Sequence, residues 1–249
     1  MLTGISAKDK IERDMLTIIN NADGQPLGCG AISTLLGKYG HTISEATVGR
    51  YLRDFDNMQY TEKVSNQGRV LSEKGKERIG IISNQEATFL GGIRFAETIR
   101  SHTKEDLIEV LVARRAIESE LAYLAALNNN KSCRDKLSEV IEEQKKQIAD
   151  VKSFSGQDVI FHKAVAKMAR NRVLEAAIAL IRQDTQLSPI LTHIRKEVNK
   201  RIYIDHMTIY EAIVSGKAEA AREAMKAHMD GLIQDVTEYW EKKEKAAQN

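Results

Sequence analysis

Four side chains in this sequence have the types and the spacing of a metal site. His206 and His228 stand symmetrically about Lys217, in a Ser-Gly-Lys segment typical of a turn between helices. If the flanking segments form antiparallel helices, both imidazoles lie on apolar stripes and come level with each other. Asp158 and His162 follow an i, i+4 spacing, which places them together on one face of another helix. One carboxylate and three imidazoles directed into an apolar interior predict a divalent metal site.

Each of these residues also has a simpler interpretation. A single buried histidine is more often a hydrogen-bonded core residue than a ligand, and Asp158 would suit the first turn of any helix because of the helix dipole. The combination favours a metal, since three of the six histidines fall on inward stripes at matching heights. Unpaired buried polar groups cost about 2 kcal/mol or more each, so they need partners. Neutral imidazoles with a carboxylate suit zinc, nickel or manganese better than calcium or magnesium.

The composition describes a helix-rich globular chain with room for one large domain or two small ones. Its 37 basic and 35 acidic side chains nearly cancel, so no overall field indicates a nucleic acid or a membrane as partner. Cys29 and Cys133 stand far apart, in no metal or redox spacing. No apolar run reaches the length of a membrane span, and the start lacks a signal-peptide pattern. We therefore expect a cytoplasmic protein without a membrane partner.

The first part of the chain predicts a winged helix-turn-helix domain over residues 1–80. Three helical patterns are followed by two short strand patterns, which a Ser-Asn-Gln-Gly turn separates. These segments are residues 8–20, residues 27–39, a helix capped by Ser44, and strands at 60–64 and 69–71. In such a domain the third helix enters the major groove of double-stranded operator DNA.

Several residues of this domain are suited to contact DNA. Arg50 can pair with guanine or hold a phosphate, while Arg53 and Arg69 suit phosphates. Two arginines on a short helix are ordinarily solvated charges, so this prediction depends on the order of helices and strands around them. The predicted DNA-binding residues are Ser44, Thr47, Arg50, Arg53 and Arg69.

The same stretch also resembles known winged helices. The segment Ile-Ser-Glu-Ala-Thr-Val-Gly-Arg-Tyr-Leu at 43–52, continued through Gly75, resembles the module of ribonuclease R and of archaeal nitrogen-regulator repressors. It is less similar to the amino-terminal domain usual in GntR regulators. Their stretch rich in Leu-Pro-Ser-Glu-Arg has no counterpart here, and Gln59 stands where glycine is common before the wing.

The remainder of the chain predicts helices alone. Residues 81–102 follow Gly80 and contain Gly91 and Gly92, and they are predicted to be a linker, with a short helix between 84 and 100. From the capping-box pattern at Thr103 onward, apolar residues recur at helical spacing through residue 245, and no useful length alternates with period two. The chain is therefore mainly α, with an all-α antiparallel bundle over 103–245.

Several motifs of this bundle resemble the FadR-type C-terminal (FCD) ligand-binding domain of GntR regulators. They are Arg-Ala-Ile-Glu from Arg115, Asp-x-x-Phe-His from Asp158, and the two final helices around His206 and His228. In that family an aspartate and three histidines bind a divalent metal inside the bundle. The resemblance places these ligands at Asp158, His162, His206 and His228.

The resemblance also implies an effector site. An arginine of the first FCD helix commonly reaches the ligand pocket, and Arg115 matches that position, with Arg114 as the alternative. An inward arginine beside a divalent cation would bind a small carboxylate through a bidentate pair. A salt bridge from Arg115 to Glu118 is the competing interpretation.

Together these features predict a DNA-binding transcriptional regulator. We expect a homodimer whose C-terminal domain binds a divalent metal and a small organic-acid effector that changes operator binding. One alternative is a hydrolase-like metalloenzyme, since an open histidine-rich site can activate water. It lacks an obvious general base and leaves the winged helix unexplained. A second alternative is a direct metal sensor, with the ion itself as the signal.

Overall fold

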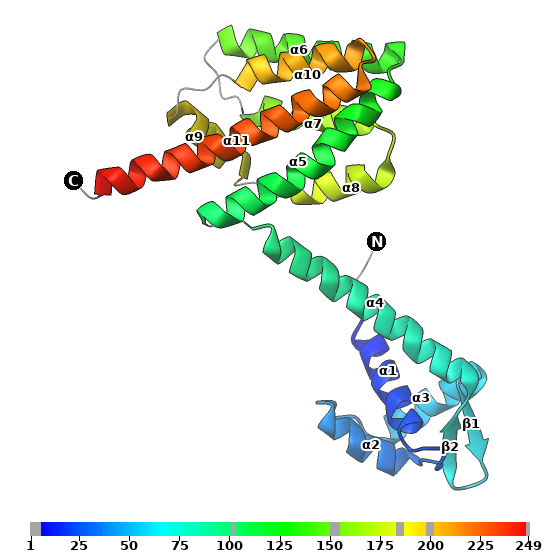
Figure 1. The fold of residues 1–249 in the computed structure, drawn as a ribbon. Coiled ribbons are helices and arrows are strands. Elements are labelled where there is room, and N and C mark those ends of the chain that lie inside the picture. The colour runs from blue at the N-terminus through cyan, green and yellow to red at the C-terminus, as the bar shows by residue number, and fades with distance from the viewer. Residues whose placement is uncertain (1–5, 101–102, 150–154, 183–186, 198–201, 248–249) are drawn as a thin grey trace. The chain divides into compact units, whose positions relative to one another are not determined.

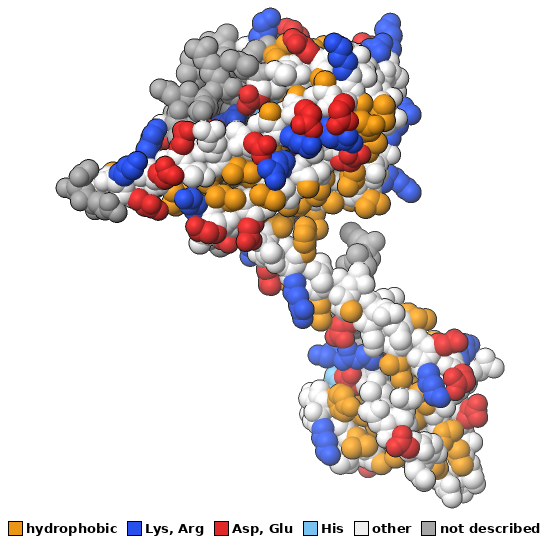
Figure 2. Space-filling view, viewed as in Figure 1, with side chains coloured by type: hydrophobic (Ala, Val, Ile, Leu, Met, Phe, Trp, Pro, Cys, Tyr) orange, Lys and Arg blue, Asp and Glu red, His pale blue; other side chains and the backbone are white. Residues whose placement is uncertain are grey.

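The computed structural model describes residues 6–100, 103–149, 155–182, 187–197 and 202–247. Within it the chain forms two compact units, Met1–Phe95 and Ala96–Asn249. Each unit is described by itself below. None of the described helices combines the length and apolar composition needed to cross a membrane. Basic and acidic side chains are interspersed over the visible face of each unit (Figure 2).

The N-terminal unit confirms the predicted winged helix-turn-helix. Three helices precede a two-stranded antiparallel hairpin, which leads into a long fourth helix (Figure 1). The elements are α1 (Ala7–Asn20), α2 (Cys29–Lys38), α3 (Glu45–Asn57), β1 (Thr61–Val64), β2 (Gly68–Leu71) and α4 (Glu73–Thr98). One apolar cluster holds the helices together, because each contributes one stripe, including Leu16, Ile32, Leu36, Leu52 and Phe55.

The wing is attached to the connection between α1 and α2. Leu27 and Arg69 exchange two backbone hydrogen bonds of 3.0 Å, which adds a short bridge to the hairpin. Gly68 has a φ of +139°, and a Cβ there would lie 2.3 Å from the carbonyl of Leu27. Only glycine allows this close approach, so the turn residue fixes where the wing lies.

Helix α4 differs from the predicted linker. Gly80, Gly91 and Gly92 were expected to interrupt the helical pattern, whereas α4 is continuous from Glu73 to Thr98 and contains all three. A glycine inside a helix costs about 1 kcal/mol relative to alanine, which weakens a helix without preventing it. The assignment of 81–102 as a linker between domains stays a prediction.

The C-terminal unit is all-helical in its described residues, as predicted. Helices α5 and α11 are the longest and pack along each other, and α7 lies against α5, α6, α8 and α9. The helices are α5 (Lys104–Leu127), α6 (Lys131–Ala149), α7 (Ser155–Met168), α8 (Arg172–Ile181), α9 (Leu187–Glu197), α10 (Ile202–Val214) and α11 (Ala218–Ala247). Their apolar faces form one core, with Leu111, Phe161, Ile209 and Met225 fully or almost fully buried.

The turn between α10 and α11 has the predicted form. Gly216 takes a left-handed φ of +68°, and the N–H of Lys217 donates to the carbonyl of Ala212 at 3.0 Å. This is how a glycine ends a helix and satisfies its last carbonyls. The reversal makes α10 and α11 neighbours, so His206 on the first helix faces His228 on the second.

Candidate metal centre

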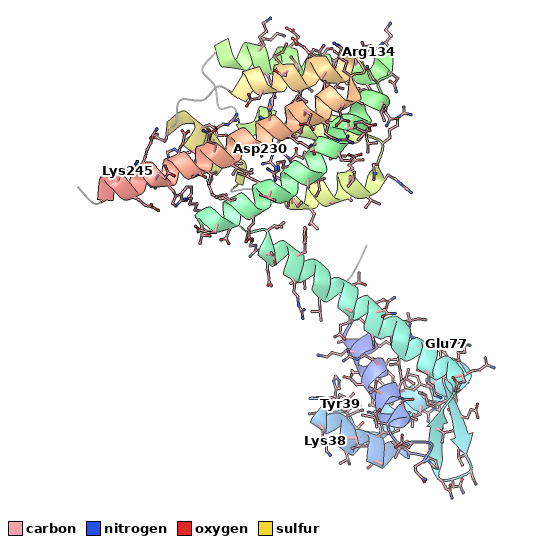
Figure 3. All side chains as sticks on the ribbon, in the orientation of Figure 1. Lys38, Tyr39, Glu77, Arg134, Asp230 and Lys245 are labelled. Atoms are coloured by element: carbon pink, nitrogen blue, oxygen red, sulfur yellow. The ribbon has the colours of Figure 1, made fainter. Side chains whose placement is uncertain are left out.

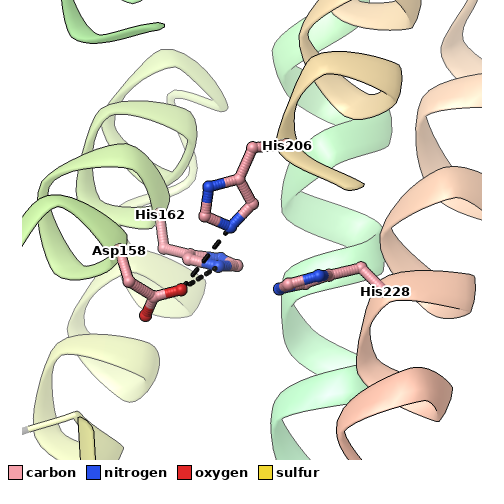
Figure 4. Close-up of side chains that lie close together, drawn as sticks. All are labelled: Asp158, His162, His206 and His228. Carbon is pink, nitrogen blue, oxygen red and sulfur yellow. Dashed lines mark ion pairs between the residues drawn. The ribbon is translucent and has the colours of Figure 1, made fainter. Parts of the chain in front are cut away.

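The structure brings the four residues of the predicted metal site together. Asp158 and His162 come from α7, His206 from α10 and His228 from α11 (Figure 4). One nitrogen or carboxylate oxygen from each lies within 4.8 Å of the others. All three histidines are at least 97% buried. The two residues spaced i, i+4 on α7 and the two histidines on either side of the α10–α11 turn therefore surround one small interior volume.

Each imidazole is held from outside by a different acceptor. Gln144 Oε1 lies 3.1 Å from Nδ1 of His206, and Asp205 Oδ2 lies 3.1 Å from Nδ1 of His228. Nδ1 of His162 forms an ion-pair contact with Glu118. A neutral imidazole that donates from Nδ1 keeps a lone pair on Nε2, so these partners set the tautomer a metal ligand needs.

The inward nitrogens have no hydrogen-bond partner. Nε2 of His162, His206 and His228 are all buried, and none has a hydrogen-bond partner in the described structure. Those of His162 and His206 lie 3.5 Å from Oδ1 of Asp158, beyond a good hydrogen bond (dashed in Figure 4). Lone pairs directed at one point, with an oxygen beside them, form the donor set of a divalent transition metal.

Protonation states agree with this donor set. Burial lowers the pKa of His206, and it lowers the pKa of His228 to about 3. Both rings are therefore neutral near pH 7, as ligands must be. Burial alone would raise the pKa of Asp158, but the neighbouring histidines and Arg182 hold it well below its usual range. The carboxylate is ionised and available to a cation.

A buried charge network adjoins the cluster. Glu118 accepts from Nε of Arg114 at 2.7 Å and from Nη2 of Arg182 at 2.9 and 3.0 Å. Arg182 also donates from Nη1 to Oδ2 of Asp158 at 3.2 Å. Burial by itself would raise the pKa of Glu118, but Arg182, His162 and Arg114 lower it far below its usual range. Nη2 of Arg114 is buried with no hydrogen-bond partner.

A third arginine supports the histidine of α11. Arg195, 4% exposed, donates to Asp235 at 2.9 Å and to Asp205 at 3.1 Å. Asp205 in turn faces Nδ1 of His228. The guanidinium therefore fixes the carboxylate that orients this imidazole.

Comparison with known proteins identifies two domains and the relatives of the chain. Residues 109–231 match the FCD domain, and residues 14–79 match the ribonuclease R winged-helix domain. The HTH-type transcriptional regulator LutR of Bacillus subtilis is 26% identical over 143 residues, covering 55% of this chain and 65% of its own length. The chain carries an FCD domain, and its homologues are regulators of the GntR family.

Two further proteins are similar. The global nitrogen regulator NrpR of Methanocaldococcus jannaschii is 30% identical over 128 residues, covering 45% of this chain and 24% of its own length. A solved structure titled Streptococcus agalactiae GntR covers 91% of this chain and 98% of its own, at 16% identity and a TM-score of 0.45. The chain spans less than two thirds of the length of both curated relatives.

Within the FCD domain, the predicted effector residue lies elsewhere than expected. The side chain of Arg115 is 41% exposed and pairs with Asp230, which Figure 3 labels on α11. It does not reach the histidine cluster, so its predicted inward position is wrong. Its neighbour Arg114 is 2% exposed and joins the buried network through Glu118. Successive helical residues differ by about 100° around the axis, which turns one arginine in and the next one out.

The predicted DNA-binding residues are placed in two ways. Ser44 caps α3 by accepting from the N–H of Thr47 at 3.3 Å, and the Thr47 hydroxyl accepts from Arg50 at 3.1 Å. Arg50 and Arg53 are exposed on α3.

Arg69 is already engaged within its own domain. It donates to Asp56 at 2.9 and 3.2 Å, and its side chain is 17% exposed. A phosphate contact from Arg69 would have to compete with this ion pair. No spacing in the sequence indicated Asp56 as its partner.

Other residues around the cluster were also missed by sequence reasoning. Glu118 stands four positions after Arg114, and Asp205 directly precedes His206, so both could have been found by examining the neighbours of the motifs. Gln144 lies on α6 and Arg182 directly follows α8, and neither residue carries a spacing signal.

Proposed function

We propose that this FCD protein is a DNA-binding transcriptional regulator whose C-terminal unit binds one divalent transition-metal ion and a small carboxylate effector. The observation that carries the proposal is the set of three buried Nε2 atoms that have no hydrogen-bond partner beside the ionised Asp158. A buried polar group without a partner costs about 1–3 kcal/mol. A single cation accounts for all three nitrogens at once.

The chain's own residues fit such an ion. His162, His206 and His228 would each donate through Nε2, while their Nδ1 atoms stay with Glu118, Gln144 and Asp205. Asp158 would add a carboxylate oxygen. When bound, zinc, nickel or manganese would supply a positive centre that accepts an oxyanion.

Charge favours an anionic effector beside that ion. The carboxylates of Asp158 and Glu118 are balanced by the guanidinium groups of Arg114 and Arg182. Adding a divalent cation to this balanced set leaves excess positive charge in a buried place, which an anion would neutralise. Arg114 keeps one buried N–H group free to receive it. The effector role proposed from the sequence for Arg115 therefore moves to Arg114.

The N-terminal unit would supply DNA binding. Arg50 and Arg53 are exposed on α3, the helix that enters the major groove in winged helix-turn-helix domains. One short helix reads too few base pairs for useful selectivity, so we propose a homodimer that reads two half-sites. Effector binding would then change how the two DNA-binding units are placed.

The direct metal sensor stays a second candidate, because the unpaired nitrogens favour a metal whether or not an effector exists. Titrating the metal and organic acids separately against operator binding distinguishes the two. The hydrolase alternative gains no support. Glu118, the buried carboxylate beside the cluster, is occupied by two arginines, and LutR and NrpR are regulators by name.

Adjacent arginines provide a matched test of the effector site. Arg114→Lys keeps the charge but loses the planar guanidinium, so affinity for a carboxylate should fall about tenfold or more. Arg115→Lys changes the neighbouring, exposed residue and should leave the affinity for the carboxylate unaltered. Calorimetry of the metal-loaded protein with a panel of organic acids measures both, with metal content checked by elemental analysis. Equal affinities in the two variants would show that Arg114 does not contact the carboxylate.

A further inference from the structure

The two oxygens of Asp158 face different partners. Oδ1 is directed at the histidines, 3.5 Å from Nε2 of both His162 and His206. Oδ2 instead accepts from Nη1 of Arg182 at 3.2 Å. Only one oxygen of this carboxylate is therefore directed at the point where the imidazoles converge.

Arg182 is itself held firmly. Its Nη2 donates to both oxygens of Glu118 at 2.9 and 3.0 Å, and its side chain is 10% exposed. Glu118 is fixed in turn by Arg114 and by contact with His162. Charge-assisted hydrogen bonds of a planar guanidinium to two carboxylates are strong and directional, so moving Arg182 would break several of them.

This arrangement affects how Asp158 can bind a cation. A carboxylate ligates a metal ion through one oxygen or through both. While Oδ2 accepts a charged hydrogen bond from Arg182, it is not free to become a second ligand atom. Three imidazoles and one oxygen then leave two positions of a six-coordinate ion for other groups, whereas chelation by both oxygens would fill one of them.

We propose that Arg182 is a positioning residue that restricts Asp158 to one ligand oxygen and so keeps a coordination position open for the effector. This inference rests on the proposed metal and effector function. The inference goes beyond that function because it makes Arg182, which acts through Asp158, responsible for the open coordination position. A merely structural ion pair would have a different signature, because its loss would weaken the metal site as a whole.

The test compares Arg182→Met, at the residue that caps the C-terminus of α8, with Arg172→Met, at an exposed arginine at the start of the same helix. Full-length proteins are loaded with cobalt(II), whose visible absorption reports coordination number, and then titrated with glycolate as a small hydroxy-acid probe. Arg182→Met should keep one ion per chain, with metal affinity equal to or above that of the wild type. Its cobalt spectrum should change before glycolate is added, and glycolate affinity should fall at least tenfold. Arg172→Met should match the wild type.

The contrary outcomes are distinct. Loss of the metal from Arg182→Met would make Arg182 a structural residue, and a spectrum identical to that of Arg172→Met would show no restriction of Asp158. Either result overturns the inference. A wild type that binds no cobalt would overturn the proposed function itself. If Arg182→Met fails to fold by circular dichroism, Arg182→Lys replaces it, because one ammonium cannot hold both carboxylates in the same way. It should change the spectrum in the same direction.

Discussion

The two units treat their buried charges in opposite ways. In the N-terminal unit, Glu12 is paired with Arg78 at 2.7 Å, and Asp14 with Arg13 and His41 at 2.7 Å each. In the C-terminal unit, charges converge on one interior point and some stay unsatisfied. All the buried side-chain nitrogens without a hydrogen-bond partner in the described residues belong to this unit, on Arg114, His162, Arg195, His206 and His228.

This contrast indicates where each unit acts. The described buried polar side chains of the N-terminal unit all have partners, so its candidate function lies with exposed side chains such as Arg50 and Arg53. The C-terminal unit carries unpaired donors and acceptors in its interior, at a cost in stability that a bound ion and anion would offset. Changes to surface arginines should therefore affect partners without affecting folding, while changes in the bundle should affect both.

The largest expected effect is the loss of a metal ligand. His228→Ala should lower metal affinity by a hundredfold or more, since removal of even an outer partner of a ligand typically costs about 10–100-fold. His193→Ala, an exposed histidine of the same unit, is the matched control. Competition with a chelator measures affinity, and elemental analysis measures content. Full metal occupancy in His228→Ala would contradict the assigned ligands.

Removing the metal should destabilise one unit only. With free metal at a hundred times its dissociation constant, binding contributes about 2.7 kcal/mol to stability. Chelation should therefore lower the melting transition of the C-terminal unit and leave that of the N-terminal unit in place. Calorimetric scans with and without chelator measure this. Equal shifts of the melting temperature in both units, or no shift in either, would contradict a metal site in the C-terminal unit alone.

The surface of α3 gives the next effect. Arg50→Ala should lose about 1–3 kcal/mol of affinity for the operator if it reads a base. The free energy of unfolding should change by less than about 0.5 kcal/mol, because the residue is exposed. Binding titrations on operator and on random DNA measure the first quantity. Identical losses on both would make Arg50 a phosphate contact, as expected of Arg53→Ala.

A smaller effect is a pH dependence of the metal-free bundle. Burial lowers the pKa of His228 to about 3, below its ordinary value near 6.5, so the unfolded chain binds a proton that the fold rejects. The contribution of neutral His228 to the free energy of unfolding is therefore fully present above the unfolded pKa near 6.5. It falls as the pH drops towards the pKa of about 3 in the folded state. Between pH 7.5 and 5.5 the loss should be about 1.4 kcal/mol for this residue.

Chemical denaturation of metal-free protein at several pH values measures this loss. His228→Asn should remove that share of the pH dependence, while His193→Asn should not. A metal-free wild type whose stability is the same at both pH values would show that His228 is not held neutral by burial.

Local sequence determined most of the elements and the four candidate ligands. Ser44 caps α3 and Gly216 ends α10, because both depend on backbone conformations and hydrogen bonds within a few residues. The candidate ligands follow from the same local rules. Asp158 and His162 share one helical face, and a single turn makes His206 and His228 neighbours.

Only the tertiary structure decided which side chains serve these ligands. The helical spacing of α5 already placed Arg114 on the stripe of Leu111, but the family motif favoured Arg115, and only the structure decided that Arg114 is the inward arginine. The pairing of Arg182 with Asp158, of Gln144 with His206 and of Arg69 with Asp56 joins segments far apart in the chain. Such pairs depend on how helices and strands are rotated and shifted against each other when the core packs, and a linear pattern does not contain that information.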